Sequence, residues 1–165
     1  NNMAVTTQNS TEYAATIATP LVKAGTTGDK GKLRTLAFSF NQSGVGDAGS
    51  MIVLGKIPAG TVKIIGGLSR FYCNIVASSA TIDIGWQAYT DANGATVALD
   101  VDGMVDGLDV DTVGYQTMEG NTAATKLLGG NHTFTSDDGV IITIKSIAAL
   151  ADDDDVDGII TYILD

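Results

Sequence analysis

The segment Thr81 to Tyr89 has the sequence TIDIGWQAY and carries the clearest structural signal in the chain. Apolar Ile82, Ile84 and Trp86 alternate with small or polar residues. Because successive side chains of a β-strand point to opposite faces of its sheet, this pattern predicts a strand with one face in the core and one in water. We expect Trp86 to be a core residue.

The same period of two recurs in both directions from this segment. It predicts strands at residues 33–40, 51–57, 61–65, 68–76, 133–135, 140–147 and 159–164. In the strand that precedes Thr81, we expect Phe71, Cys73 and Ile75 to be buried. Pro58-Ala59-Gly60 predicts a tight turn that makes residues 51–57 and 61–65 a hairpin.

Composition agrees with a fold made of strands. The chain has 165 residues, of which 44% are hydrophobic, 20 are glycine and only 2 are proline. Val, Ile and Thr far outnumber the helix-favouring Glu, Gln, Lys and Arg. We therefore predict an all-β fold, a two-sheet antiparallel sandwich that is jelly-roll-like. Residues 1–32, which lack a sustained period, are expected to form an extended N-terminal arm on a β-sandwich domain of residues 33–165.

The least regular part of the sequence runs from Asp100 to Asn131. It is rich in Gly and Asp, and a short helical piece is expected near residues 112–118. Long loops in compact domains are commonly functional. We expect this region to contact a partner or another copy of the chain.

Charge is distributed unevenly along the chain. Residues 1–75 hold seven Lys/Arg and three Asp/Glu, whereas residues 76–165 hold two and sixteen, for a net charge of −10. An acidic surface repels phosphate, so a nucleic-acid partner and an anionic membrane are not expected. The arm is basic near its end, and we predict that it binds a partner through Lys23, Lys30, Lys32 and Arg34.

A second acidic stretch, Asp152 to Asp157, contains the motif Asp153-x-Asp155-x-Asp157-Gly158, which copies the opening of an EF-hand loop. An EF-hand needs a bidentate Glu at its twelfth position, where this chain has Leu164, so a true EF-hand is excluded. Two interpretations remain open. One is a looser Ca²⁺ site at Asp153, Asp155 and Asp157, and the other is a solvated acidic turn.

Signals for catalysis are weak. Gly44 to Gly49 matches G-x-G-x-x-G, but a strand is predicted to follow it instead of the helix that a nucleotide site needs. The single histidine, His132, has no adjacent Ser or Cys motif, and the single cysteine, Cys73, lies within a predicted strand. We expect no catalytic residue and no cofactor other than the possible Ca²⁺, and hence no enzyme.

Several short motifs resemble those of small tailed-bacteriophage virion proteins of the capsid decoration, or cement, type. They are Gly55-Lys56-Ile57-Pro58-Ala59-Gly60-Thr61-Val62-Lys63-Ile64-Ile65-Gly66-Gly67 with Leu68-Ser69-Arg70, then Ala80 to Trp86, Asp102-Gly103 to Asp111, and Gly158 to Tyr162. The resemblance covers roughly residues 50–165 and leaves the arm uncovered. It implies a β-sandwich, commonly a homotrimer, that binds the major capsid protein on the outer surface of the head and bridges capsomers. Such proteins carry no catalytic residues.

Two other functions remain open. One is a phage tail or fibre component. The other is an extracellular carbohydrate-binding β-sandwich with a calcium site in its aspartate loops, in which Tyr72, Trp86 and Tyr89 would stack on sugars; because Trp86 shares its face with Ile82 and Ile84, we expect it to be core instead.

Overall fold

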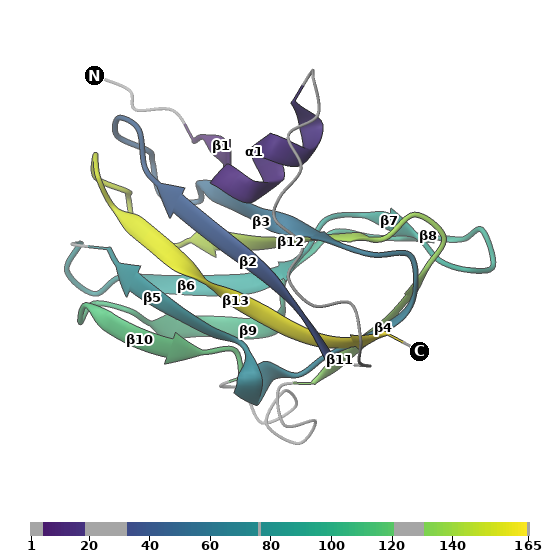
Figure 1. Cartoon of the computed structure of the whole chain (residues 1–165). Helices are drawn as coiled ribbons and strands as arrows, with labels where there is room; N and C mark the ends of the chain where they lie inside the picture. The colour runs from purple at the N-terminus through teal and green to yellow at the C-terminus, as the bar shows by residue number, and fades with distance from the viewer. Residues whose placement is uncertain (1–4, 19–32, 76, 121–130, 165) are drawn as a thin grey trace.

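The computed structural model describes residues 5–18, 33–75, 77–120 and 131–164. In this part of the chain two large β-sheets pack face to face, and β7 (Tyr89–Thr90) and β8 (Thr96–Val97) form a separate two-stranded sheet (Figure 1). The first sheet contains β1 (Thr7–Asn9), β3 (Met51–Ile57), β12 (Val140–Ser146), β6 (Thr81–Trp86) and β9 (Asp100–Asp109). The second contains β2 (Leu33–Asn41), β13 (Asp155–Leu164), β4 (Gly60–Ile64), β5 (Arg70–Asn74), β10 (Gly114–Thr117) and β11 (His132–Ser136).

The strand order is that of a jelly roll. β4 and β5 lie one after the other along β13, with the 3₁₀ turn η1 (Gly66–Leu68) between them. On their far side, β11 pairs with β4 and β10 pairs with β5. The second sheet therefore reads β2, β13, β4/β5, β11/β10, and the first reads β3, β12, β6, β9 with β1 added at its edge. The predicted all-β, jelly-roll-like sandwich is confirmed.

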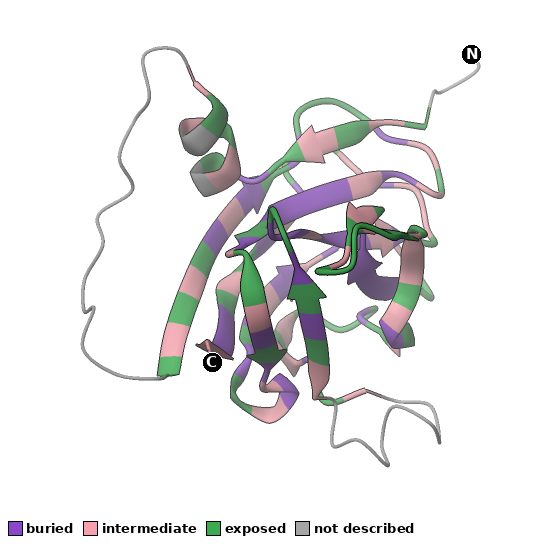
Figure 2. Cartoon of the chain, turned by 90° about the vertical axis from the view of Figure 1, so that its right-hand side faces the viewer, coloured by how far each residue is buried: buried purple, intermediate pink, exposed green. Residues whose placement is uncertain are grey.

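The core lies between the sheets, and alternation along each strand decides what enters it. Phe71, Cys73 and Ile75 are fully buried, and Trp86 is 7% exposed, as expected. Figure 2 shows the alternation of burial along β2, in which Phe38 and Phe40 are buried. The largest buried side chains come from both sheets: Ile52, Leu54, Ile82, Ile84, Ile142 and Ile144 from the first, and Ile64, Phe71 and Phe134 from the second.

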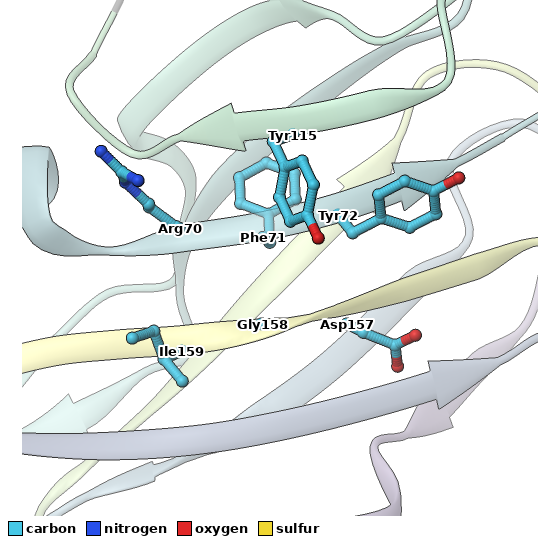
Figure 3. Close-up of a pocket in the computed structure, with 7 residues that line it drawn as sticks. All are labelled: Arg70, Phe71, Tyr72, Tyr115, Asp157, Gly158 and Ile159. Atoms are coloured by element: carbon cyan, nitrogen blue, oxygen red, sulfur yellow. The ribbon is translucent and has the colours of Figure 1, made fainter.

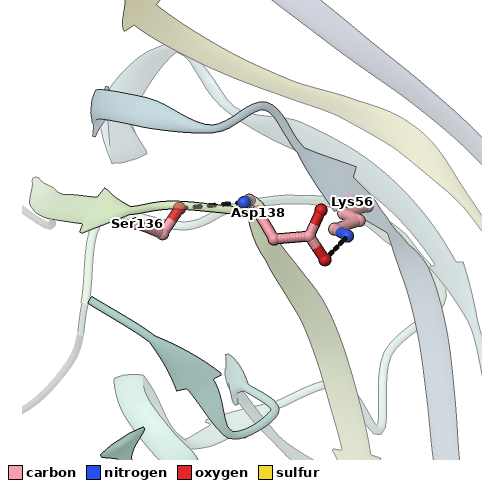
Figure 4. A network of polar contacts seen from close by, with 4 residues as sticks. Lys56, Ser136 and Asp138 are labelled. Atoms are coloured by element: carbon pink, nitrogen blue, oxygen red, sulfur yellow. Dashed lines mark hydrogen bonds and ion pairs between the residues drawn. The ribbon is translucent and has the colours of Figure 1, made fainter. Parts of the chain in front are cut away.

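The predicted hairpin of residues 51–57 and 61–65 is wrong. Both strands exist, but β3 pairs with β12 and β1, whereas β4 pairs with β11 and β13. Pro58 and Ala59 carry the chain from one sheet to the other. A second crossing, between β11 and β12, lies beside it, and an ion pair of 2.9 Å between Lys56 and Asp138 links the two (Figure 4). Ser136 Oγ accepts a hydrogen bond from the Gly139 backbone N–H in that crossing.

The prediction of an irregular region from Asp100 to Asn131 is also wrong for those of its residues that the structure describes. Residues 100–109 form β9, and the expected helical piece near 112–118 is instead the strand β10. β9 pairs with β6 in antiparallel orientation, and the register between the two strands shifts twice. At Gly85 of β6 the Asp100 carbonyl oxygen lies so close that a Cβ would overlap it. Residues 121–130 lie outside the described residues.

Two further details differ from expectation. Asp83 and Gly85, expected to face water, are buried, and Asp83 Oδ1 accepts a hydrogen bond of 2.9 Å from the Gly107 N–H because β9 curls over this face of β6. β13 begins at Asp155, within the expected acidic turn. Asp155 and Asp157 are compatible with a strand there because they alternate with Val156 and Gly158 and so point away from the core.

Part of the expected arm is folded onto the sandwich. β1 pairs in parallel with β3, and α1 (Thr11–Ile17) contacts β2 and β3. Ser10, fully buried, caps α1 through the Tyr13 N–H and donates its hydroxyl hydrogen to the Leu54 carbonyl at 2.6 Å. The boundary at residue 32 stays a prediction. None of the helices in the described ranges is long and apolar enough to span a membrane.

Candidate interaction surfaces

A hollow of about 340 Å³ opens on the outer face of the second sheet, over β10, β5 and β13 (Figure 3). We call it the Tyr115 hollow, and its lining residues are Arg70, Phe71, Tyr72, Tyr115, Asp157, Gly158 and Ile159. Strand register explains why they meet. Tyr115, Tyr72 and Asp157 are directly opposed on three adjacent strands and form one row across the sheet. In the next row Arg70 is opposite Ile159.

Tyr115 is the most exposed large apolar side chain in the described part of the chain, with 82% of its surface open. It lies on β10, which is an edge strand among the residues that the structure describes. Its ring meets that of Tyr72 edge to face, with centroids 5.4 Å apart and an angle of 69° between the planes. Because such contacts contribute beyond simple burial, Tyr72 holds the Tyr115 ring in place above the sheet.

Gly158 lies in the floor of the hollow. β5 approaches β13 so closely at this residue that a Cβ would overlap the Arg70 carbonyl and lie 2.6 Å from Phe71 Cα. Because Gly158 alternates with the outward-facing Asp157 and Ile159, a Cβ at this residue would point to the core side of the sheet. The side chains of Asp157 and Ile159 lie on either side of Gly158 in Figure 3.

One end of the sandwich, which we call the acidic end, carries Asp47, Asp109, Asp111 and Asp152 to Asp154. It is formed by the segments 42–50, 77–80, 109–113 and 147–154, which contain Asp but no Lys, Arg or His. Gly46 exchanges backbone hydrogen bonds with Leu150, and the Gly44 N–H donates to Asp152 Oδ1 at 2.6 Å. The acidic clusters that are separate in the sequence therefore lie together in part, since Asp109 and Asp111 share this end with Asp152 and Asp153.

The three residues predicted to bind Ca²⁺ do not come together, because Asp155 and Asp157 lie along β13 and Asp153 lies in the turn before it. Asp153 occupies a turn with φ of 70°, Asp155 accepts a hydrogen bond of 2.6 Å from Asn41 Nδ2, and Asp157 lines the Tyr115 hollow. Within the described ranges, no three His, Cys, Asp or Glu side chains come close enough together to hold a metal ion. The calcium site stays a prediction from sequence.

Of the residues predicted to bind a partner, Lys23, Lys30 and Lys32 lie outside the described residues. Arg34 is the second residue of β2, and the strand runs about 24 Å from Arg34 to Asn41, beside the acidic end. The Arg34 side chain is half-buried, and its Nε has no hydrogen-bond partner in the part of the chain that the structure describes. Its contact with a partner remains a prediction.

The remaining chemical candidates are packing residues. His132 lies between the rings of Trp86 and Phe134, at centroid distances of 4.5 and 4.3 Å, and burial lowers its pKa. Burial also raises the pKa of the Cys73 thiol to about 12, which keeps it protonated and unreactive. The loop from Gly44 to Gly49 joins β2 to β3 without a helix, so it lacks the helix that would bind a pyrophosphate.

Sequence reasoning did not identify the Tyr115 hollow. Tyr115 lay in the segment expected to be irregular, and Asp157 was assigned to a turn. The signal that was present is the alternation in Tyr72-Cys73-Asn74, which places Tyr72 opposite a buried Cys73 and so on the outer face. The sequence could not show which residues of β10 and β13 face Tyr72, because the register between distant strands is set by the fold.

No family model and no curated protein sequence matches this chain. Among solved structures, a chain in "Capsid of Ralstonia phage GP4" superposes with a TM-score of 0.62 at 16% identity, over 96% of this chain and 97% of that chain. Two structures of infectious bursal disease virus, one of the Gt strain and one of the VP2 subviral particle, give TM-scores of 0.40 and 0.41 at 12% identity. Each alignment covers 90% of this chain but only 36% of the bursal disease virus chain. The likeness to the phage capsid chain extends over the whole jelly roll and establishes a shared fold.

Proposed function

We propose that this chain is a structural protein of a virus particle, a phage head decoration or cement protein that binds the outer capsid surface and bridges capsomers. The observation that carries the proposal is the whole-chain superposition on a chain of the Ralstonia phage GP4 capsid, in which 96% of one chain and 97% of the other are aligned. The aligned region takes in nearly all of the residues of both chains.

The packing of the molecule supports a mechanical role. Core side chains from both sheets are fully buried, and the loops of the acidic end are bonded to one another through Gln42, Gly44, Gly46 and Gly49. A rigid unit of this kind transmits force between the neighbours that it contacts. We propose the major capsid protein as the main partner.

Charge suggests an orientation on the shell. We propose that the acidic end points to solvent and that the basic part of the arm, Lys23, Lys30 and Lys32, binds the shell. Arg34 lies near the start of β2, whereas Asn41 at the other end of the strand pairs with Asp155, which follows the acidic end in sequence. An outward acidic end also disfavours contact with packaged DNA at the inner surface.

For self-association we propose a homotrimer that uses the region 100–117. This region supplies the edge strand of each sheet, β9 in one and β10 in the other. Edge strands carry unpaired backbone groups that a second copy can bind.

The test is reconstitution on particles stripped of this protein. Re-addition of the chain is expected to restore resistance to heat and low salt. The variant Lys23→Gln/Lys30→Gln/Lys32→Gln should bind the shell more weakly, whereas a control with the same kind of change on the sandwich, Lys63→Gln/Lys145→Gln, should bind normally. Particles that are equally resistant with and without the chain would contradict the cement role.

The location of the chain on the particle separates the head from the alternative tail or fibre position. Antibody labelling viewed by electron microscopy should mark the whole head surface. Labelling confined to the tail would replace the decoration proposal with that alternative.

A further inference from the structure

The Tyr115 hollow brings aromatic and charged groups together on an open surface. Tyr115 and Tyr72 supply ring surface, and Asp157 and Arg70 supply a carboxylate and a guanidinium group in adjacent rows of the same sheet face. We propose that this hollow binds a neutral glycan through a pyranose ring. This site goes beyond the proposed capsid role and does not depend on it.

The aromatic part of the site fits the apolar side of a sugar ring. Most of the Tyr115 ring is open to solvent, and the edge-to-face contact with Tyr72 fixes its orientation. In Figure 3 the Tyr115 ring extends from β10 toward β13, with its hydroxyl over the hollow. A pyranose ring that packs its C–H face on Tyr115 covers apolar surface that is otherwise exposed to water.

The polar part of the site is not used by the protein itself. Within the described ranges, the side chains of Arg70, Asp157, Tyr72 and Tyr115 form no ion pair and no side-chain hydrogen bond. Arg70 and Asp157 are exposed and lie in adjacent rows, and no ion pair of the described residues joins them. The carboxylate of Asp157 can accept hydrogen bonds from sugar hydroxyls, and the guanidinium of Arg70 can donate to them.

The volume of the Tyr115 hollow and the charge of the chain restrict the class of sugar that can bind. A volume of about 340 Å³ lies at the lower end of the range for ligand pockets and suits about one or two sugar rings. The hollow holds one carboxylate, Asp157, and one guanidinium group, Arg70, so the repulsion of carboxylated, sulfated or phosphorylated sugars comes from the net charge of −10. An uncharged sugar avoids this repulsion and still uses both charged groups.

The test uses saturation-transfer NMR on the purified full chain. The probes are neutral oligosaccharides that end in glucose, galactose or N-acetylglucosamine, compared with sialylated and sulfated ones. We expect at least one neutral probe to bind and the anionic probes to bind more weakly. Absence of signal from every neutral probe, or preference for the anionic ones, would overturn the proposal.

Amino-acid substitutions test whether the neutral probe binds in the Tyr115 hollow. Tyr115→Ala and Asp157→Asn should each weaken the neutral probe by about tenfold or more, while Tyr115→Phe keeps the ring and should retain most of the affinity. Val45→Ala, an exposed apolar residue at the acidic end, and Asp102→Asn on β9 are matched controls and should bind like the native chain. Since Tyr115 is exposed, Tyr115→Ala should keep the native melting temperature.

Two outcomes would contradict the proposal that the Tyr115 hollow binds a glycan. If Tyr115→Ala and Asp157→Asn leave binding of the probe unchanged, the hollow is not the site. If Tyr115→Ala leaves glycan binding intact but abolishes binding to stripped particles, the hollow is a protein interface. Failure of the capsid reconstitution with glycan binding intact would contradict the proposed function alone.

Discussion

Trp86 is the side chain on which the core depends most at the scale of single residues. It is 7% exposed, its ring centroid lies 5.2 Å from that of Phe134, and Gly103 leaves room for its six-membered ring because a Cβ there would overlap it. Trp86→Ala should lower the free energy of unfolding by about 3 to 5 kcal/mol through the cavity it creates. Denaturant titration followed by circular dichroism measures this loss.

The control for that experiment is Tyr115→Ala, which removes an aromatic ring of similar kind from the surface. Its effect on the free energy of unfolding should stay within about 0.5 kcal/mol. A loss below about 1 kcal/mol for Trp86→Ala would mean that Trp86 does not fill the core.

His132 makes stability depend on pH. Burial lowers its pKa below the ordinary value, so the unfolded chain binds a proton more readily than the folded one. The stabilisation is therefore complete above the unfolded pKa of about 6.5 and is lost as the pH falls through the lower folded value. Because His132→Gln cannot titrate, the native chain should lose stability relative to this variant between pH 7.5 and 5.

The measurement is the free energy of unfolding of both chains across that pH range. Comparison with His132→Gln removes the contributions of other groups, among them Asp100, whose pKa is raised by burial and by its neighbour Asp102 and which acts in the opposite direction. A difference that stays constant with pH would contradict the account.

At the scale of elements, the close approach of β5 to β13 depends on Gly158. Since its Cβ would overlap the Arg70 carbonyl, Gly158→Ala forces two central strands of the second sheet apart and should cost about 1 to 3 kcal/mol. Gly114→Ala in β10 is the matched control, because nothing lies within 4 Å of its Cβ position. Equal melting temperatures for the two variants would show that this approach is not required.

Local alternation was sufficient to predict several strands and their buried faces. β2, β5 and β6 each alternate apolar and polar residues, and Phe38, Cys73 and Trp86 are buried as that period requires. Alternation does not predict which strand pairs with which. Pro58-Ala59-Gly60 has the residues of a hairpin turn, yet here it crosses between sheets, and only the packing of β3 against β12 decides this.

β9 was missed for a different reason. Asp and Gly have low β propensity, so the sequence DVDGMVDGLD does not read as a strand. At the edge of a sheet its Asp102, Asp106 and Asp109 are exposed, while Met104 and Val105 enter the core. The candidate site shares this limit, because its residues come from three strands distant in sequence, and only their register brings them together.

At the scale of the whole molecule, the fold converts a sequence asymmetry into a spatial one. Acidic residues from distant loops meet at one end, while the strand that follows the basic part of the arm starts at the other. A rigid jelly roll with one end that carries Asp but no Lys, Arg or His suits a fixed orientation on a surface. The GP4 superposition shows that a chain in a phage capsid has this fold over its full length.

The central claim is the position of this chain on a virus particle, and electron cryomicroscopy of particles with and without it tests that claim most directly. The account predicts difference density on the outer surface of the head, fitted by the jelly roll, with contacts to more than one capsomer and the acidic end toward solvent. Density inside the shell, density confined to the tail, or the absence of any difference would contradict it.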